Sequence, residues 1–376
     1  MKFVHISDLH IGKRLSEFPI VDDQRYILER IVDIVRDESP DGVLIAGDVY
    51  DNTTPSSESV QILDDFLTSL SDTGSKIFMI SGNHDSPEKI GYGSALFRRN
   101  GIHIAGRFDG PISPIRIDDK DGRSAEVFLI PFIRPFVVKR RFPDADIKDY
   151  TDAMRTILEN SPSMGLDFKV AVAHQFVTST YGDPSTCESE DPRIGDVDSM
   201  DVSVFDSFDY VALGHLHTPQ HVGRETVRYC GTPLKYSASE VSMDKTVTII
   251  EMDDEIRIRE VPLVPLRDVR KVKGKLEDII DAAKSEPNRD DLIYVELTEE
   301  TVNAMERIRQ VYPNTLHIKV IRSDNSGYAL PDIDDIRALD PMEVFEEMYK
   351  RSRGEEMTDE QRSIVRGMME DSGVRF

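Results

Sequence analysis

The sequence is short of positive charge, and this shortage excludes one way of binding nucleic acid. Lys and Arg number 46 against 70 Asp and Glu, so the net charge is −24, with a pI near 4.8. A histone-like protein, which binds nucleic acid through bulk positive charge, is therefore excluded. Nucleic acid stays open as a substrate, because bound divalent metals can supply positive charge locally.

Cysteine and long apolar runs are also scarce. Only Cys187 and Cys230 are present, without a Cys-x-x-Cys motif, which indicates two ordinary thiols in a reducing compartment. The N-terminus is polar and acidic by Asp8, unlike a signal peptide. No apolar run reaches the roughly 18 residues that a transmembrane helix requires. We expect a soluble intracellular protein that does not bind a membrane.

The remaining composition and its periodicity predict an α/β fold. Apolar residues make up 39% of the chain, enough for a real core. Up to about residue 250, short apolar runs alternate with amphipathic stretches, which is typical of buried strands covered by helices. A faster succession of strands after about residue 100 indicates a second sheet. The expected strands are Lys2–Ile6, Gly42–Ala46, Lys76–Ile80, Glu126–Ile130, Lys169–Ala173 and Tyr210–Leu213, and the first expected helices are Asp22–Glu38 and Ser56–Leu70.

The later part of the chain divides into further segments. The acidic stretch Tyr181–Asp209 predicts a solvated loop with one short helix. From Val269 the pattern restarts as strand, helix, strand, helix, strand, after a Pro262–Pro265 hinge. Two helices are then expected, opening at Asp340-Pro341 and at a Thr358-x-x-Gln361 capping box. We predict three parts, which span residues 1–262, 263–325 and 326–376.

Metal-ligating side chains follow five of the expected strands. In open α/β sheets the carboxyl edge is where ligands bind, so these residues are expected to meet. Carboxylate, amide and imidazole groups suit Mn²⁺, Zn²⁺ or Fe²⁺, whereas the lack of thiolates disfavours a structural zinc site. These side chains lie in the motifs Asp8-x-His10, Gly47-Asp48-x-x-Asp51, Gly82-Asn83-His84-Asp85, His174 and Gly214-His215-x-His217.

The ordered motifs predict a two-metal hydrolase. The Asp48 carboxylate has two oxygens and is suited to bridge two ions. Two such ions can share a hydroxide nucleophile and clamp a phosphoryl group during in-line displacement. Glycines at 47, 82 and 214 precede ligands, where the chain must turn sharply and approach the metals closely.

This set resembles the calcineurin-like metallophosphoesterase superfamily over about residues 1–250. The resemblance implies a four-layer α/β/β/α sandwich. It also implies that Asp8, His10, Asp48 and His217 hold one ion and that Asp48, Asn83, His174 and His215 hold the other. His84 matches the catalytic histidine that helps the leaving oxygen depart, and Asp51 matches the Asp that orients this histidine. Some related chains have His at position 51, and we expect the residue there to support the site without binding a metal.

Narrower motifs resemble the SbcD-type nucleases of DNA double-strand-break repair. They are Ser7–Lys13, Asp23–Arg25, Gly47–Asp51 with Pro55-Ser56, and Tyr229–Leu234. This resemblance implies a prokaryotic, nucleoid-associated cytoplasmic enzyme with two Mn²⁺ ions and with 3′→5′ exonuclease and single-strand endonuclease activity. It also implies a small βαβαβ capping domain, a helical C-terminal tail, and a homodimer formed through Ser56–Leu70 or Glu88–Arg99. The implied partner is an SMC-like coiled-coil ATPase of the SbcC type.

Two basic stretches are candidate DNA contacts, with a solvated face near a domain junction as the alternative. One, in a loop with several phenylalanines, comprises Lys139, Arg140 and Arg141; the other comprises Arg270, Lys271 and Lys273. The C-terminal helices carry apolar residues at helical spacing, suited either to a local core or to a groove of the ATPase partner. The candidate partner contacts are Phe345, Met348, Ile364 and Met368.

Two other functions stay open at this point. The same site could serve a small-substrate phosphodiesterase or a phosphatase, although such an enzyme needs no partner-binding tail. A non-catalytic scaffold for the ATPase is the other alternative, and it predicts lost ligands. All seven candidate ligands are present.

Overall fold

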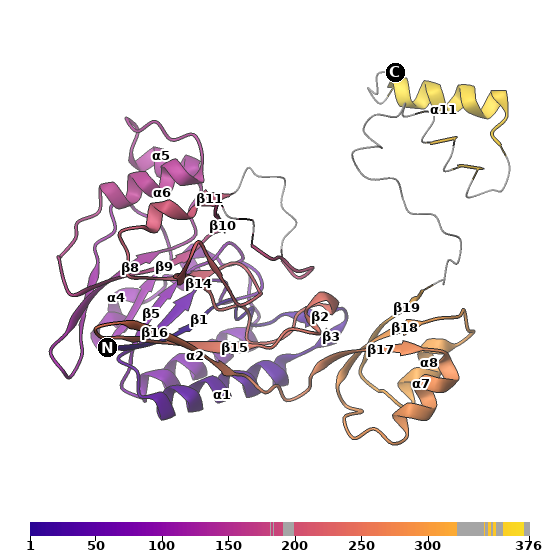
Figure 1. Ribbon diagram of the computed structural model, residues 1–376, viewed down its shortest axis with the longest axis horizontal. Helices are drawn as coiled ribbons and strands as arrows, with labels where there is room; N and C mark the ends of the chain where they lie inside the picture. Colours follow the sequence, from indigo (N-terminus) through magenta and orange to yellow (C-terminus); the bar gives the residue numbers. More distant parts are fainter. Residues whose placement is uncertain are drawn as a thin grey trace. The chain divides into compact units, whose positions relative to one another are not determined.

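Two six-stranded sheets lie between pairs of helices, as Figure 1 shows. The first has the strand order β16-β15-β1-β4-β5-β6, and the second has the order β13-β14-β12-β9-β8-β7. The strands of the first sheet are β1 (Lys2–Ile6), β4 (Gly42–Ala46), β5 (Lys76–Ile80), β6 (Ile102–Ala105), β15 (Thr246–Met252) and β16 (Ile256–Pro262). Those of the second are β7 (Ile115–Asp118), β8 (Ser124–Ile130), β9 (Phe168–His174), β12 (Tyr210–Gly214), β13 (Gln220–Val222) and β14 (Arg224–Tyr229).

The structure is a computed structural model, and it separates the chain into two units, Met1–Ile321 and Arg322–Phe376. The residues that it describes are 1–180, 182, 184–190, 199–321, 342, 345–346, 349–350 and 356–371. Among these residues, no helix is both long enough and apolar enough to cross a lipid bilayer.

The centre of the molecule is the apolar layer between the two sheets. Phe3, Leu44 and Phe78 of the first sheet share a buried cluster with Val170 and Ala212 of the second. Strands β1, β4, β5 and β6 pair in parallel, as do β8, β9, β12 and β14. Parallel strands buried on both faces read as continuous apolar runs, which is why the strand predictions succeeded here.

Helices cover the outer face of each sheet. Helices α1 (Val21–Glu38) and α2 (Ser57–Ser71) pack on the first sheet, and α5 (Pro135–Arg141) and α6 (Tyr150–Glu159) pack on the second. Helix α1 turns its apolar stripe inward, and α2 begins at an N-cap, Ser56, whose hydroxyl accepts a hydrogen bond from the Ser59 N–H. The predicted four-layer α/β/β/α fold is confirmed.

The remaining elements of the sandwich are short connections. They are β2 (Arg14–Leu15), β3 (Phe18–Pro19), α3 (Pro87–Ile90), α4 (Ser94–Phe97), η1 (Arg98–Asn100), β10 (Val177–Thr178), β11 (Met200–Asp201), η3 (Val202–Phe205) and η4 (Ala238–Glu240). The 3₁₀ helix η3 lies in the acidic stretch where one short helix was expected.

A small βαβαβ module follows the sandwich and packs against it. Its elements are β17 (Val269–Gly274), α7 (Leu276–Ala283), β18 (Leu292–Leu297), α8 (Ala304–Arg309) and β19 (Thr315–Val320). The three strands are parallel in the order β17-β18-β19. The Arg267 guanidinium is held by the buried Asp23 carboxylate at the start of α1, so a charged contact joins the module to the sandwich. The division of unit 1 at residue 262 stays a prediction.

In the second unit the structure describes helix α11 (Asp359–Asp371). The predicted capping box is present at its start. The Thr358 N–H donates to Gln361 Oε1 at 2.9 Å, and the Gln361 N–H donates to Thr358 Oγ1 at 3.3 Å. The helix start expected at Asp340-Pro341 lies outside the described residues.

A buried histidine in β1 makes the stability of the fold depend on pH. Burial, together with the nearby Arg228, lowers the pKa of His5 from 6.5 to about 3. Between these values the unfolded chain binds a proton that the folded chain does not, so stability falls as the pH falls. We expect the free energy of unfolding of the natural protein, relative to His5→Gln, to fall by about 2 kcal/mol between pH 7 and pH 5. Urea unfolding at both pH values measures this difference, and a difference that does not vary with pH would contradict it.

Candidate metal centre

The predicted ligands meet where the two sheets come together. Asp8 and His10 follow β1, Asp48 follows β4, and Asn83 follows β5. His174 is the last residue of β9, while His215 and His217 follow β12. Three of these strands belong to the first sheet and two to the second. The sandwich therefore brings one edge of each sheet to a single site.

The backbone at these strand ends is held in unusual conformations. Asp8, His10, Asp48 and His215 all have positive φ, at 51°, 44°, 46° and 107°. Non-glycine residues rarely adopt such angles, and when they do they cluster at functional sites. A Cβ on Gly214 would lie 1.9 Å from the Ala46 carbonyl oxygen, so only glycine allows this approach of β12 to β4. Four of the seven candidate ligands therefore have an unusual backbone conformation.

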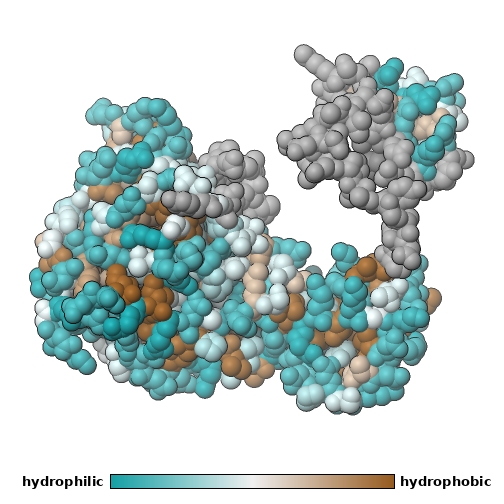
Figure 2. Space-filling model, viewed as in Figure 1, coloured by the Kyte–Doolittle hydropathy of each residue, from teal (hydrophilic) through white to brown (hydrophobic). Residues whose placement is uncertain are grey.

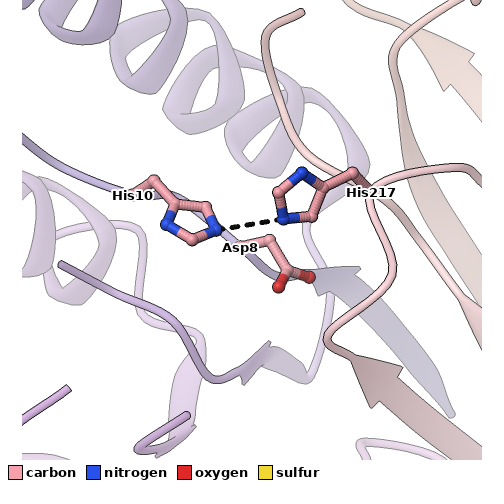
Figure 3. A group of neighbouring side chains, drawn as sticks. All are labelled: Asp8, His10 and His217. Carbon is pink, nitrogen blue, oxygen red and sulfur yellow. Dashed lines mark hydrogen bonds between the residues drawn. The ribbon is translucent and has the colours of Figure 1, made fainter. Parts of the chain in front are cut away.

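Figure 3 shows the first half of the centre, where the Asp8 carboxylate lies beside two imidazoles. The Nε2 atoms of His10 and His217 face each other at 3.1 Å. The Nδ1 of His217 meets a hydroxyl, Ser189 Oγ, at 2.6 Å, and the Nδ1 of His10 faces a carboxylate oxygen, Asp51 Oδ1, at 3.4 Å. A proton on each Nδ1 suits these outward partners. Both Nε2 lone pairs then point into the same space, next to a carboxylate.

The second half of the centre shows the same convergence of acceptors. The Nδ1 of His174 donates to the Ala46 carbonyl oxygen at 2.8 Å. Its Nε2 faces Asn83 Oδ1 at 2.9 Å and Asp48 Oδ2 at 3.3 Å, and the Nδ1 of His215 lies 3.0 Å from the same Asn83 oxygen. A neutral His174, with its proton on Nδ1, would present the Nε2 lone pair to the Asn83 and Asp48 oxygens. The arrangement therefore requires positive charge, from a proton or from a metal ion.

The electrostatics of the buried carboxylates express the same requirement. Burial, with Asp48 as a like-charged neighbour, raises the pKa of Asp8 to about 7. Burial alone would lower the pKa of His174, but the Asp48 carboxylate outweighs it and raises this pKa to about 9. The His174 charge in turn holds the pKa of Asp48 well below its usual range, against burial. In this part of the chain, Asp8, His10 and His217 form one group that could hold a metal ion, and Asp8, Asp48 and His174 form another. The donor set fits divalent cations.

Comparison with known proteins shows the family of the chain. The family model of the calcineurin-like phosphoesterases matches residues 1–219, and the SbcD_C model, described as the type 5 capsule protein repressor C-terminal domain, matches residues 265–353. The SbcD subunit of nuclease SbcCD from Staphylococcus epidermidis is 33% identical over 374 residues, which cover 97% of this chain and 96% of that protein. The chain belongs to the SbcD-type nucleases of the calcineurin-like phosphoesterase family. A solved dimetal phosphatase from Danio rerio also aligns, with 10% identity, a TM-score of 0.40, and coverage of 70% of this chain and 96% of that one.

As a member of this family the chain is a metal-dependent phosphodiesterase, and its candidate catalytic histidine is held by the main chain. His84 Nδ1 donates to the main-chain oxygen of Asp51 at 3.0 Å, so the exchangeable nitrogen is Nε2. This Nε2 lies 3.9 Å from Asp48 Oδ2. The His84 side chain is 21% exposed, whereas the side chains of His10 and His174 are fully buried. His84 is thus at the open side of the centre.

Asp51 meets the two histidines through different atoms: its main-chain oxygen accepts from His84, and its carboxylate faces His10. The carboxylate lies 3.4 Å from His10 Nδ1 and accepts a hydrogen bond of 2.8 Å from Lys13 Nζ. The Asp51 N–H also donates to the Ile11 carbonyl oxygen, which turns residue 51 toward the loop after β1. Burial would raise the pKa of Asp51, but these partners lower it to about 2. Asp51 is therefore an ionised neighbour of a candidate ligand.

Substitution of Asp51 tests this role. We expect Asp51→Asn to bind Mn²⁺ about 10- to 100-fold more weakly, because His10 loses the charge that orients its Nδ1 proton. Isothermal titration of Mn²⁺ measures the change. Asp118→Asn is the matched control, since Asp118 is an exposed partner of Arg116 on β7. Equal affinities in the two variants would contradict the assignment.

Several residues around the centre were not identified from sequence. Asp85 accepts hydrogen bonds from the N–H groups of Val49, Tyr50 and Gly82, and so braces the loops that carry Asp48 and Asn83. In the acidic stretch that was read as a solvated loop, Ser189 and Glu190 are half-buried and contact His217. The Gly-Asn-His-Asp motif could have drawn attention to Asp85. No local pattern marks Ser189, because its partners are distant in the chain.

The first basic stretch of the nuclease lies on α5 and is interleaved with aromatic rings. The Arg140 guanidinium lies 5.6 Å from the centre of the Phe136 ring, and the Arg134 guanidinium lies 5.7 Å from that of Phe132. Phe132 in turn contacts the His174 ring edge-on at 6.3 Å. Lys139 and Arg140 are exposed, while Arg141 pairs with Asp109. Phe132 thus contacts both a candidate ligand, His174, and an exposed cation, Arg134.

The second basic stretch is largely neutralised by acids of its own module. Arg270 pairs with Glu286 and with Asp291, the latter at 2.6 Å from its Nε. Lys271 lies 3.4 Å from Glu296 on the next strand. Lys273, on β17, is exposed. The local excess of positive charge in the sequence therefore overstates the positive field at this surface.

The candidate partner contacts lie in the second unit. Phe345, Ile364 and Met368 are exposed there, at 38%, 58% and 65%. Met348 lies outside the described residues. The role of these side chains in binding a partner stays a prediction.

Proposed function

We propose that the chain is a manganese-dependent DNA nuclease with 3′→5′ exonuclease and single-strand endonuclease activity. It acts in double-strand-break repair in the cytoplasm of a prokaryote, together with an SMC-like ATPase of the SbcC type. The observation that carries the proposal is the convergence of imidazole lone pairs and carboxylates beside an accessible histidine. The relative from S. epidermidis, which belongs to nuclease SbcCD, supports the DNA substrate and the partner.

Two divalent ions are proposed to share the centre. Asp8, His10, Asp48 and His217 would hold one, and Asp48, Asn83, His174 and His215 would hold the other. Asp48 would serve both, because its Oδ2 lies 3.8 Å from His10 Nε2 and 3.3 Å from His174 Nε2. Bound there, the ions would activate the attacking water and neutralise the charge that develops on the phosphoryl oxygens.

His84 is proposed to complete the reaction as the general acid. The attack of water on phosphorus forms one P–O bond and breaks the ester P–O bond, so a proton must reach the departing oxygen. Because Nδ1–H donates to the Asp51 carbonyl, His84 would give this proton from Nε2, which lies 3.9 Å from Asp48 Oδ2. The partly exposed side chain lets a DNA strand come within reach.

Surface features support the proposed DNA and dimer contacts. Phe132, Arg134, Phe136 and Arg140 suit unstacked bases and phosphates, as expected for a single strand entering the centre. Figure 2 shows hydrophobic residues in small groups among hydrophilic ones on the face in view. Tyr92, just before α4, and Leu96, within it, are exposed at 83% and 65%, which supports the segment Glu88–Arg99 as part of a homodimer interface.

One experiment tests the function against its alternatives. The full chain is incubated with duplex DNA labelled at the 5′ end, with circular single-stranded DNA, and with bis(nitrophenyl) phosphate, in Mn²⁺, Mg²⁺ or a chelator. We expect Mn²⁺ to support shortening of the duplex from the 3′ end and opening of the circle, and the chelator to abolish both. Hydrolysis of the small ester alone would indicate a small-substrate phosphodiesterase. No metal-dependent cleavage of any substrate would indicate a scaffold.

A further inference from the structure

A chain of hydrogen bonds runs from His217 through the half-buried Ser189 to the buried Glu240, away from the metal centre. Ser189 Oγ lies 2.6 Å from His217 Nδ1 and 2.6 Å from Glu240 Oε1. Glu240 is fully buried, and its other oxygen accepts a hydrogen bond of 2.6 Å from the buried Lys245 ammonium. The Glu240 carboxylate also accepts from the Ser237 hydroxyl at 2.8 Å. The network ends on a buried ion pair.

The hydrogen count of this network assigns the proton on His217. The Lys245 ammonium donates to Glu240, to Thr232 Oγ1 and to the main-chain oxygen of His217, which uses all three of its protons. Glu240 paired with this cation only accepts, so the single Ser189 proton points to Glu240. The Ser189 oxygen then accepts from His217, whose Nδ1 carries the proton, and it can also accept from the Cys187 thiol, whose Sγ lies 3.1 Å away. The lone pair of His217 is left on Nε2, which faces His10.

Segment 184–190 is attached to this network at several points. Glu190 Oε1 accepts from the His217 N–H at 2.8 Å, and the Glu188 N–H donates to Ser239 Oγ at 3.0 Å. Ser185 exchanges two hydrogen bonds of 2.8 Å with the Gln220 side chain through its main chain. These contacts hold Ser189 in place over an imidazole that lies 28 residues further along the chain.

We propose that Ser189 is a positioning residue for His217, anchored by the Glu240–Lys245 pair, and that segment 184–190 thereby sets the affinity of the metal centre. The proposal rests on the proposed function, because it assigns His217 to a metal. Without the Ser189 hydroxyl, the imidazole is free to move its proton to Nε2 or to rotate. A proton on Nε2 would face His10 Nε2 and remove a donor atom that the cation needs.

The test uses Ser189→Ala, Ser189→Thr and a control, Ser185→Ala, whose exposed side chain lies in the same segment. Two properties are measured on the full chain: the ¹⁵N imidazole shifts of histidine-labelled, metal-free protein, and the Mn²⁺ affinity by isothermal titration. His217 is assigned by the signal that disappears in His217→Gln. We expect His217 to carry its proton on Nδ1 in the natural protein and in Ser185→Ala. In Ser189→Ala we expect mixed tautomers and about 10- to 100-fold weaker Mn²⁺ binding, with both properties restored in Ser189→Thr.

Each other result overturns a defined part of the proposal. An unchanged tautomer and affinity in Ser189→Ala would remove Ser189 from the centre. A Ser189→Thr variant that behaves like Ser189→Ala would assign the loss to packing and overturn the hydrogen-bond role. If the natural protein binds no Mn²⁺ while the His217 tautomer still depends on Ser189, the proposed function fails, but Ser189 still positions His217. The two failures are therefore distinguishable.

Discussion

Replacement of His84 by serine is expected to lower the kcat for DNA phosphodiester cleavage by about 10²- to 10⁴-fold, the usual contribution of a general acid. Metal affinity should stay unchanged, because the inward ligand atoms come from other residues. The imidazole contacts the ring of His10 edge-on at 4.9 Å, and its Nδ1 is tied to the Asp51 carbonyl oxygen. Serine keeps the backbone of the loop and removes the proton donor.

The measurement pairs single-turnover cleavage of labelled DNA in Mn²⁺ with titration calorimetry of Mn²⁺. His221→Ser is the control, because His221 is 48% exposed and pairs with Glu225 at the surface. Loss of metal binding together with activity would contradict the assignment. Such a loss of metal binding would instead make His84 a ligand. This is open to test because His10, Asp51 and His84 also lie close enough together to hold an ion. Cleavage at the natural rate would assign the proton transfer to another group.

Replacement of Lys245 by methionine is expected to lower the free energy of unfolding by about 3–5 kcal/mol, because it leaves a buried carboxylate unpaired. The side chains of Lys245 and Glu240 are 4% and 0% exposed, so water cannot take over the lost contact. Thr232 Oγ1 and the His217 carbonyl oxygen lose a donor as well. The substitution therefore also removes a hydrogen bond to the main chain of His217, a candidate ligand just after β12.

Urea unfolding of the variants measures this effect. The double variant Glu240→Gln/Lys245→Met should recover much of the loss, because it removes the isolated charge. Lys284→Met is the control, since Lys284 pairs with Asp281 on the surface of α7 and should change stability by less than about 1 kcal/mol. A loss below about 1 kcal/mol in Lys245→Met would mean that Glu240 becomes protonated at little cost.

The two candidate ligand histidines that face each other, His10 and His217, have similar supporting groups. His10 Nδ1 faces Asp51, which pairs with Lys13, and His217 Nδ1 reaches Glu240, which pairs with Lys245, through Ser189. In each case a lysine keeps the supporting carboxylate ionised, so that it accepts and does not donate. This arrangement directs both Nε2 lone pairs inward. Four charged residues, Asp51, Lys13, Glu240 and Lys245, therefore lie behind the two histidines of the candidate metal centre.

The sequence by itself determined the layered fold and the candidate ligand set. The strands Lys2–Ile6, Gly42–Ala46 and Lys76–Ile80 have the predicted bounds, because fully buried parallel strands are continuous apolar runs bounded by turn residues. The candidate ligands follow these strands directly, and the carboxyl ends of parallel strands share an edge. The α/β pattern and the clustering of polar residues at one edge use only local order along the chain, while the four-layer order and the assignment of ligands to two ions are what the family resemblance implies.

The tertiary structure alone decided which polar groups meet. Ser189 and Glu240 are 51 residues apart, and His10 and His217 are 207 apart. The Asp51 carboxylate contacts His10 and Lys13, and Arg270 forms ion pairs with Glu286 and Asp291. A hydrogen bond or an ion pair depends on a few tenths of an ångström and on the direction of a side chain. Only the packing of the two sheets and their loops sets those quantities, so composition and spacing could name the ligands but not the residues that hold them.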